Sequence, residues 1–175
     1  MAYNWRRLAP EERAAILAQR QAESQPWHSP PYGIRGRWVH FSAACYEHKR
    51  IIGSNPRRIA CFGQELCAAL GKICESIGAW CVLPNHYHIL VLTLSVQECR
   101  KALGKMHGRL SHRWNVEDSK RGRKCWHSCL PKPVRNEHHR WAVINYIHNN
   151  PVHHKYVTKW QEWPYSSAPA FLDSV

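Results

Sequence analysis

The chain has 175 residues, 44% of them hydrophobic and 21% charged, a composition typical of one compact globular domain that excludes a disordered or fibrous protein. Lysine and arginine number 25 against 12 acidic residues, so the formal net charge is +13. This excess favours a polyanionic partner, either nucleic acid or an anionic membrane surface.

Residues 1–35 are expected to form an extension ahead of the domain. Pro10 and the acidic residues after it predict a short helix to about Glu23, which a proline-rich connector follows. The stretch Met1–Gln25 is too polar for an export signal, and the longest apolar run, Ile89–Leu94, is too short to span a bilayer. We therefore expect a cytoplasmic protein with no membrane segment.

A strand and a helix are predicted next. The bulky and branched residues within Gly36–Tyr46 favour extended backbone. From Asn55 to Ile77, apolar residues recur at steps of three and four, which predicts a helix that Gly78 ends.

Two short strands then read as a hairpin. Ala79–Leu83 and His86–Leu94 are both apolar, and only Pro84 and Asn85 separate them. Two such strands with so short a connection are expected to pair side by side in antiparallel fashion.

The next helix and the turn after it carry much of the positive charge. Ser95 and Glu98 form a capping box, which predicts a helix to about Trp114. Such charge is often only a solvated surface, but few acidic residues accompany it here, so these residues are candidate phosphate contacts. They are Lys101, Lys105, Arg109 and Arg113 on the helix, and Lys120, Arg121, Arg123 and Lys124 in the turn.

The remaining elements are a short strand, a helix and an aromatic tail. A strand is predicted around Lys124–Leu130, and Pro131 and Pro133 are expected to interrupt it. The last strong helix spans Glu137–Asn150, with Pro151 ending it. Its expected buried residues are Trp141, Ile144 and Ile147.

The order of these elements indicates the fold class. Strands and helices mix without strict alternation, which favours an α+β fold: a ferredoxin-like antiparallel sheet with helices packed on one face. We expect an extension over 1–35, the main domain over 36–155 and an aromatic C-terminal tail over 156–175.

Eight cysteines are spread singly along the chain, and in a protein that is not exported we expect them to be thiols. Cys125, His127 and Cys129 form the one local cluster. Alternation along a strand would put them on one face, so a structural zinc site there is a minor alternative.

The sharpest candidate for chemistry is His86-Tyr87-His88. Residues two apart on a strand project from the same face, so His86 and His88 can converge on one metal ion while Tyr87 points the other way. Three other His-x-His chemistries fit poorly. The residues after His88 lack the Asp and His of metallo-β-lactamases, position 90 is Leu rather than a third His, and the chain is too short for a (β/α)₈ barrel.

The second candidate is Tyr146-Ile-His-Asn-Asn150-Pro151. Residues four apart share a helix face, so Tyr146 and Asn150 would present a phenol and a carboxamide side by side. Asn149 competes with Asn150 for this place, whereas His148 faces away. The alternative is an ordinary helix end, with an asparagine next to Pro151.

Together these motifs resemble a known family. Pro84-Asn-His-Tyr-His-Ile-Leu-Val91 is similar to the HUH motif, and Tyr146-Ile-His-Asn-Asn-Pro-Val152 is similar to the nucleophile helix of single-tyrosine HUH transposases. The branch that the chain resembles most is the REP-associated tyrosine transposases, over roughly Trp27 to Leu172. The chain departs from many relatives at Cys129–Pro133, where an aromatic residue, Asp and His often stand.

The resemblance implies a metal-dependent single-stranded DNA transposase or endonuclease. It implies that His86, His88 and Asn150 hold a divalent metal, Mg²⁺ or Mn²⁺, and that Tyr146 attacks a DNA phosphate to form a 5′-phosphotyrosine link. The implied partner is single-stranded DNA, with hairpins of palindromic repeats. A monomer is favoured over a homodimer that exchanges the tyrosine helix. The alternative is a non-catalytic nucleic-acid-binding regulatory protein on the same scaffold.

Overall fold

The computed structural model describes residues 9, 11, 15 and 36–172. The helix and connector predicted for the first 35 residues fall almost wholly outside this range and stay predictions. Among the described residues, no helix is both long and apolar enough to cross a membrane.

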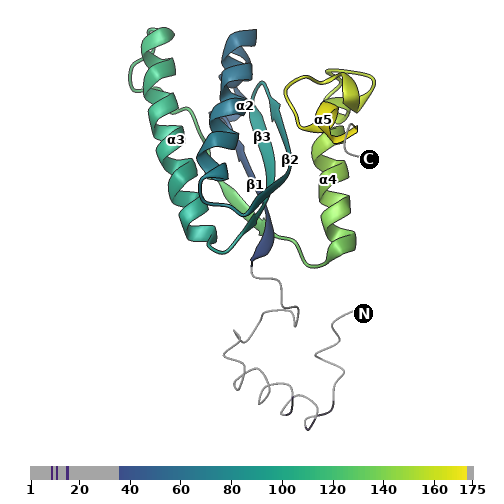
Figure 1. Cartoon of the computed structure of the whole chain (residues 1–175). Coiled ribbons are helices and arrows are strands. Elements are labelled where there is room, and N and C mark those ends of the chain that lie inside the picture. The colour runs from purple at the N-terminus through teal and green to yellow at the C-terminus, as the bar shows by residue number, and fades with distance from the viewer. Residues whose placement is uncertain (1–8, 10, 12–14, 16–35, 173–175) are drawn as a thin grey trace. The chain divides into compact units, whose positions relative to one another are not determined.

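The core of the fold is a four-stranded antiparallel sheet in the order β2-β3-β1-β4 (Figure 1). This confirms the predicted α+β class. The strands are β1 (Arg37–Ala44), β2 (Ser76–Leu83), β3 (His86–Thr93) and β4 (Leu130–Pro133). The α-helices are α2 (Pro56–Gly71), α3 (Val96–Glu117), α4 (Glu137–His153) and α5 (Ala168–Leu172), and the 3-10 helices are η2 (Tyr46–His48), η3 (Ile52–Ser54) and η4 (Trp160–Glu162).

Helices lie on both faces of the sheet, not on one face as the sequence predicted. On one face the Tyr87 ring packs against Phe62 of α2 and bonds His107 of α3 through its hydroxyl. On the other face His86 and His88, its neighbours on β3, contact α4. The physical reason is that β1 to β3 carry large apolar residues at consecutive positions, so both faces must be covered to remove them from water.

The predicted hairpin is confirmed, and it aligns the two histidines with β1. β2 and β3 meet at Pro84 and Asn85, and β3 pairs with β1 so that His86 lies opposite Ala44 and His88 opposite Ser42. Small residues opposite both histidines leave open space above this end of the sheet.

The helix predicted to run to Gly78 ends seven residues earlier, at Gly71. Ile77 lies in β2, where it pairs with Val91. Its apolar character fits both a helix stripe and a strand, and pairing with β3 decides between them.

The fourth strand begins where the sequence predicted an interruption. Leu130–Pro133 pairs with β1, whereas Lys124–Leu130 contributes an isolated bridge between Trp126 and Cys45. The prediction failed because β4 is an outermost strand with a single neighbour. Proline has no backbone N–H, and on such a strand it can occupy positions where that N–H would point away from the neighbour. Pro131 and Pro133 are therefore tolerated.

Helix α4 continues through Pro151 to His153. Proline removes one backbone donor, and this close to the helix end the loss is limited to one hydrogen bond. Ile144 and Ile147 are buried as predicted, but Trp141 is 45% exposed and lies beside Arg140.

The aromatic residues after α4 pack back onto β2. Val82 N–H donates to the Tyr165 carbonyl at 2.8 Å, Ser167 N–H donates to the Trp80 carbonyl at 2.9 Å, and the Trp163 indole donates to the Val82 carbonyl at 2.9 Å. This segment therefore extends the hydrogen bonding of the sheet beyond β2.

One buried histidine makes stability depend on pH. The His107 ring stacks on Trp126 with centroids 4.1 Å apart, and burial lowers its pKa from 6.5 to about 4. The folded protein therefore binds fewer protons than the unfolded chain between these values, so stability falls as the pH drops from 6.5 toward 4.

We expect His107→Gln to weaken this pH dependence. Between pH 7 and pH 5 the free energy of unfolding should fall by about 2 kcal/mol less in the variant than in the wild type. Urea denaturation at both pH values measures the difference, and His112→Gln, at an exposed position on α3, is the control. Equal losses in His107→Gln and the wild type would contradict the assignment.

Candidate functional site

The two sequence motifs meet at one pocket of about 540 Å³ between the start of β3 and α4. Its floor comes from β1 and β3, and its sides come from α4, the η2 turn and the segment before β4. The lining residues include Ser42, His48, Asn85, His86, His88, His127, Tyr146 and His154.

His86 is held so that one ring nitrogen remains free to bind a ligand. The Asn85 amide N–H₂ donates to the His48 carbonyl at 3.3 Å, which turns its oxygen toward His86 Nδ1 at 2.8 Å. In the neutral tautomer that carries its proton on Nδ1, toward Asn85, Nε2 presents a lone pair. Nε2 lies 3.0 Å from Asn150 Oδ1, and two acceptors so close together favour a cation between them.

His88 presents a second free nitrogen in the same pocket. Its Nδ1 lies 3.0 Å from His40 Nε2 of β1, whereas its Nε2 is buried without a hydrogen-bond partner among the described residues. A buried nitrogen without a partner is costly, and a bound cation would remove that cost. His40 thus occupies the place of an outer residue that orients a metal-binding histidine.

Burial keeps these imidazoles neutral, which is the form that binds metals. It lowers the pKa of His88 to about 2 and that of His40 to about 4, with nearby positive charge as a smaller cause in both. The pKa of His86 is also lowered, chiefly by burial, and the bond to Asn150 partly opposes this shift.

Helix α4 places Tyr146 and Asn150 one turn apart on the face toward the histidines. The Tyr146 ring lies 5.2 Å from the His88 ring and 6.1 Å from the His40 ring, between centroids, and Tyr146 is 47% exposed. Asn150 is buried, whereas its competitor Asn149 donates to the Asn145 carbonyl within the helix. The half-exposed phenol therefore lines the pocket, and the carboxamide lies buried beside His86.

His148 faces away from this pocket, as the helix spacing indicates. It is buried on the other side of α4, where its Nε2 lies 2.9 Å from Ser167 Oγ and its ring stacks on Trp160. It therefore fastens the C-terminal segment to α4.

The alternative zinc cluster does not come together. Cys125 Sγ donates toward Asn115, His127 Nε2 accepts from Glu47 N–H, and Cys129 Sγ contacts the Tyr87 hydroxyl. In the part of the chain that the structure describes, no three His, Cys, Asp or Glu side chains form a metal-binding group. The set around His86 differs because its third member is an amide.

Several pocket residues escaped the sequence analysis. His154 lies four residues after Asn150, and its ring centroid is 4.9 Å from that of His86, so continuing the same helix spacing would have found it. His40, His48 and His127 reach the site only through strand pairing and loop packing, which the linear sequence does not reveal.

Some of the predicted phosphate contacts already have partners within the protein, and others are exposed without an ion pair to the described residues. On α3, Arg109 and Arg113 both pair with Glu65 of α2, and Lys101 pairs with Glu98, so three of these four charges have acidic partners. In the turn, Arg123 pairs with Asp118, and the Lys124 ammonium lies 4.5 Å from the Tyr46 ring centroid. Lys105, Lys120 and Arg121 are exposed and form no ion pair with the described residues.

Comparison with solved structures supports the fold. A structure of a REP-associated tyrosine transposase bound to a REP hairpin is similar to this chain with a TM-score of 0.59 and 18% sequence identity, over 81% of this chain and 82% of that chain. No protein-family profile and no curated protein sequence matches the chain. At this identity the likeness establishes a fold shared with that transposase.

Proposed function

We propose that this protein is a metal-dependent single-stranded DNA endonuclease and strand transferase of the HUH type, with Tyr146 as its nucleophile. The observation that carries the proposal is that Tyr146, His86 and His88 line one pocket while Asn150 lies buried 3.0 Å from His86 Nε2. A protein that only bound DNA would have no need of a phenol beside two unprotonated imidazole nitrogens.

The proposed metal ligands are Nε2 of His86, Nε2 of His88 and Oδ1 of Asn150. His86 Nε2 and Asn150 Oδ1 lie 3.0 Å apart, close enough for both to hold one cation. A divalent cation held there would polarise the phosphate and offset the negative charge that develops on its oxygens. Imidazole ligands suit Mn²⁺ as well as Mg²⁺, so we propose either ion.

Tyr146 would act on the phosphate held in this pocket. Its hydroxyl gives up its proton as the oxygen forms a bond to phosphorus, the bond from phosphorus to the 3′ oxygen breaks, and that oxygen takes up a proton and leaves as a 3′-hydroxyl. The 5′-phosphotyrosine link keeps the energy of the broken bond for rejoining to another 3′-hydroxyl.

The DNA partner follows from charge and from the fold. The net charge of +13 suits a polyanion, and the similar structure is bound to a REP hairpin. We therefore propose single-stranded DNA with a hairpin as the substrate. Because one chain supplies both the tyrosine and all three metal ligands, the geometry supports a monomer.

A covalent adduct tests this function. The protein is incubated with single-stranded hairpin DNA and Mn²⁺, and a denaturing gel should show a protein–DNA band that EDTA prevents. Peptide mass mapping should place the nucleotide on residue 146. Tight DNA binding without any adduct under these conditions would favour the regulatory, non-catalytic alternative.

A further inference from the structure

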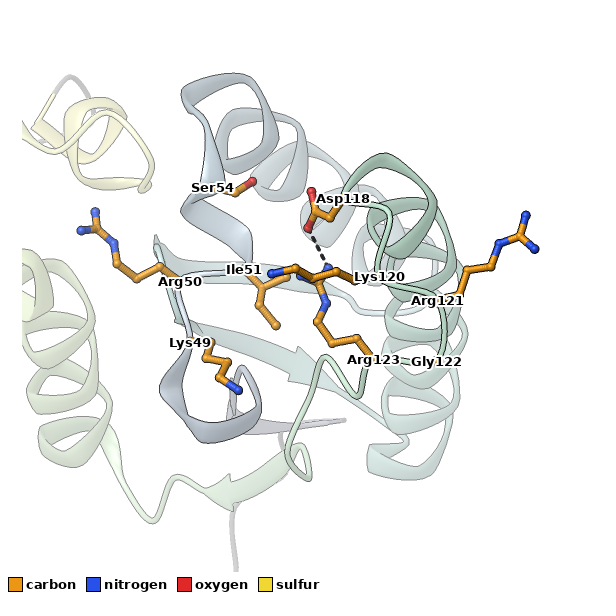
Figure 2. A pocket seen from close by; sticks show the side chains of 9 residues that line it. All are labelled: Lys49, Arg50, Ile51, Ser54, Asp118, Lys120, Arg121, Gly122 and Arg123. Carbon is orange, nitrogen blue, oxygen red and sulfur yellow. Dashed lines mark hydrogen bonds and ion pairs between the residues drawn. The ribbon is translucent and has the colours of Figure 1, made fainter.

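A second, larger pocket lies beside the candidate site and is strongly basic. It has a volume of about 900 Å³ and lies between the η2–η3 segment and the turn after α3 (Figure 2). Five of its lining residues are cationic and one is acidic. The lining residues are Lys49, Arg50, Ile51, Ser54, Asp118, Lys120, Arg121, Gly122 and Arg123.

The single acidic residue is already neutralised. Asp118 accepts from both terminal nitrogens of buried Arg58, at 2.7 and 3.0 Å, and from Arg123 at 2.8 Å. These bonds lower the pKa of Asp118 to about 2, with Arg58 as the main cause. Its carboxylate therefore fixes the turn to α2 and leaves little negative charge for the pocket.

The two lysines of the pocket remain available to a ligand. Lys120 reaches across the pocket toward the opposite wall, whereas Arg121 points outward from the turn (Figure 2). Lys49 pairs with Glu47, but both side chains are more than half exposed, and such a pair is worth little in water. Lys49 can therefore exchange Glu47 for a ligand at low cost, and Lys120 forms no ion pair with the described residues that a ligand would have to replace.

Neighbouring residues of the same two segments line the two pockets. Tyr46 N–H donates to the Cys125 carbonyl at 2.8 Å, and His127 N–H donates to the Ala44 carbonyl at 2.9 Å, so the segment around η2 is hydrogen-bonded to the segment between α3 and β4. His48 and His127 of these segments line the candidate site, and Lys49 and Arg123 line the basic pocket.

Unusual backbone at this boundary directs neighbouring residues to different pockets. Glu47 and His48 have φ values of 54° and 51°, which non-glycine residues rarely adopt. Such strain persists where the surrounding structure enforces it, often at functional sites. Here it accompanies a change from His48 in the candidate site to Lys49 in the basic pocket within one residue.

The lining indicates which part of a nucleic acid would bind. It holds no aromatic side chain on which a base could stack, whereas it offers several ammonium and guanidinium groups. We propose that this pocket binds backbone phosphates of the same DNA strand whose cleaved phosphate lies in the candidate site. This inference rests on the proposed function and adds the path of the strand to it.

Removing one lysine from each wall tests the proposal. In Lys49→Ala/Lys120→Ala the Arg58–Asp118–Arg123 network stays intact. The control is Arg37→Ala/Lys72→Ala, which removes two exposed charges at the other end of the domain. Arg37 is about 23 Å from Ala44 along β1, and Lys72 is about 24 Å from Pro56 along α2. Fluorescence anisotropy of a labelled DNA hairpin with a single-stranded extension measures affinity over a sodium chloride series.

We expect the pocket variant to bind about tenfold more weakly at low salt. Its slope of log affinity against log salt should be smaller by about 1.4, since each lost contact to single-stranded phosphate removes about 0.7. The control should bind within about twofold of the wild type. Equal affinities and slopes for the two double variants would overturn the proposal.

The adduct assay separates this inference from the proposed function. At saturating DNA, the pocket variant should still form the Tyr146 adduct. A wild type without adduct would refute the nuclease, while the anisotropy comparison would still decide whether the pocket binds DNA. The anisotropy comparison is repeated with DNA strands shortened from each end in turn. Shortening from one end should abolish the difference in affinity between the two double variants, whereas shortening from the other end should leave it. Its persistence after shortening from either side would contradict a single path.

Discussion

Replacing Tyr146 with phenylalanine is expected to abolish the covalent protein–DNA adduct and to slow cleavage by more than about 10³-fold, because the variant lacks the oxygen that would bond to phosphorus. The ring should keep its place beside His88, since the substitution removes only an exposed hydroxyl. DNA affinity and the melting temperature should therefore change little. A denaturing gel with time points measures the rate.

The matched control is Tyr165→Phe. Tyr165 lines a different pocket, beside Trp80 and α2, so this variant loses a phenol hydroxyl outside the candidate site. It should form adduct at the wild-type rate. If Tyr146→Phe also kept that rate, the nucleophile would be another residue and the mechanism proposed for this pocket would be wrong.

Replacing His88 with alanine is expected to weaken Mn²⁺ binding by at least about 10²-fold and to slow adduct formation by about 10²- to 10³-fold. The variant removes the nitrogen that is buried without a partner, and it also leaves His40 without its neighbour. Isothermal titration with Mn²⁺ measures binding directly, without reference to DNA.

Two further variants guard against simple loss of folding. His86→Ala removes a more exposed ligand and should weaken Mn²⁺ binding to a similar degree, whereas His112→Ala, on the exposed surface of α3, should bind as the wild type does. Wild-type Mn²⁺ affinity in folded His88→Ala and His86→Ala would refute the proposed metal site.

The local motifs were predictable because each depends on neighbours in the chain. Alternation along a strand put His86 and His88 on one face, and the helix repeat put Tyr146 beside Asn150. The Pro84-Asn85 connection fixed the hairpin without any knowledge of the tertiary structure. The short-range physics of turns and periodicity is enough for such features.

What the sequence did not reveal depends on packing between distant segments. His40 reaches His88 only because β1 pairs with β3 in one register. The position of α4 on the second face also follows from the apolar residues of three strands taken together. The prolines of β4 misled the prediction because their tolerance depends on the strand having a single neighbour.

Both margins of the sheet are guarded against self-association. An unprotected outer strand can template the addition of a strand from another molecule, which leads to aggregation. At β4, Pro131 and Pro133 cannot donate the hydrogen bonds that such growth needs. At β2, the chain's own Tyr165 and Ser167 occupy the sites where a foreign strand would dock. Neither outer strand of the sheet thus offers a second copy of the chain a free row of backbone hydrogen-bonding groups.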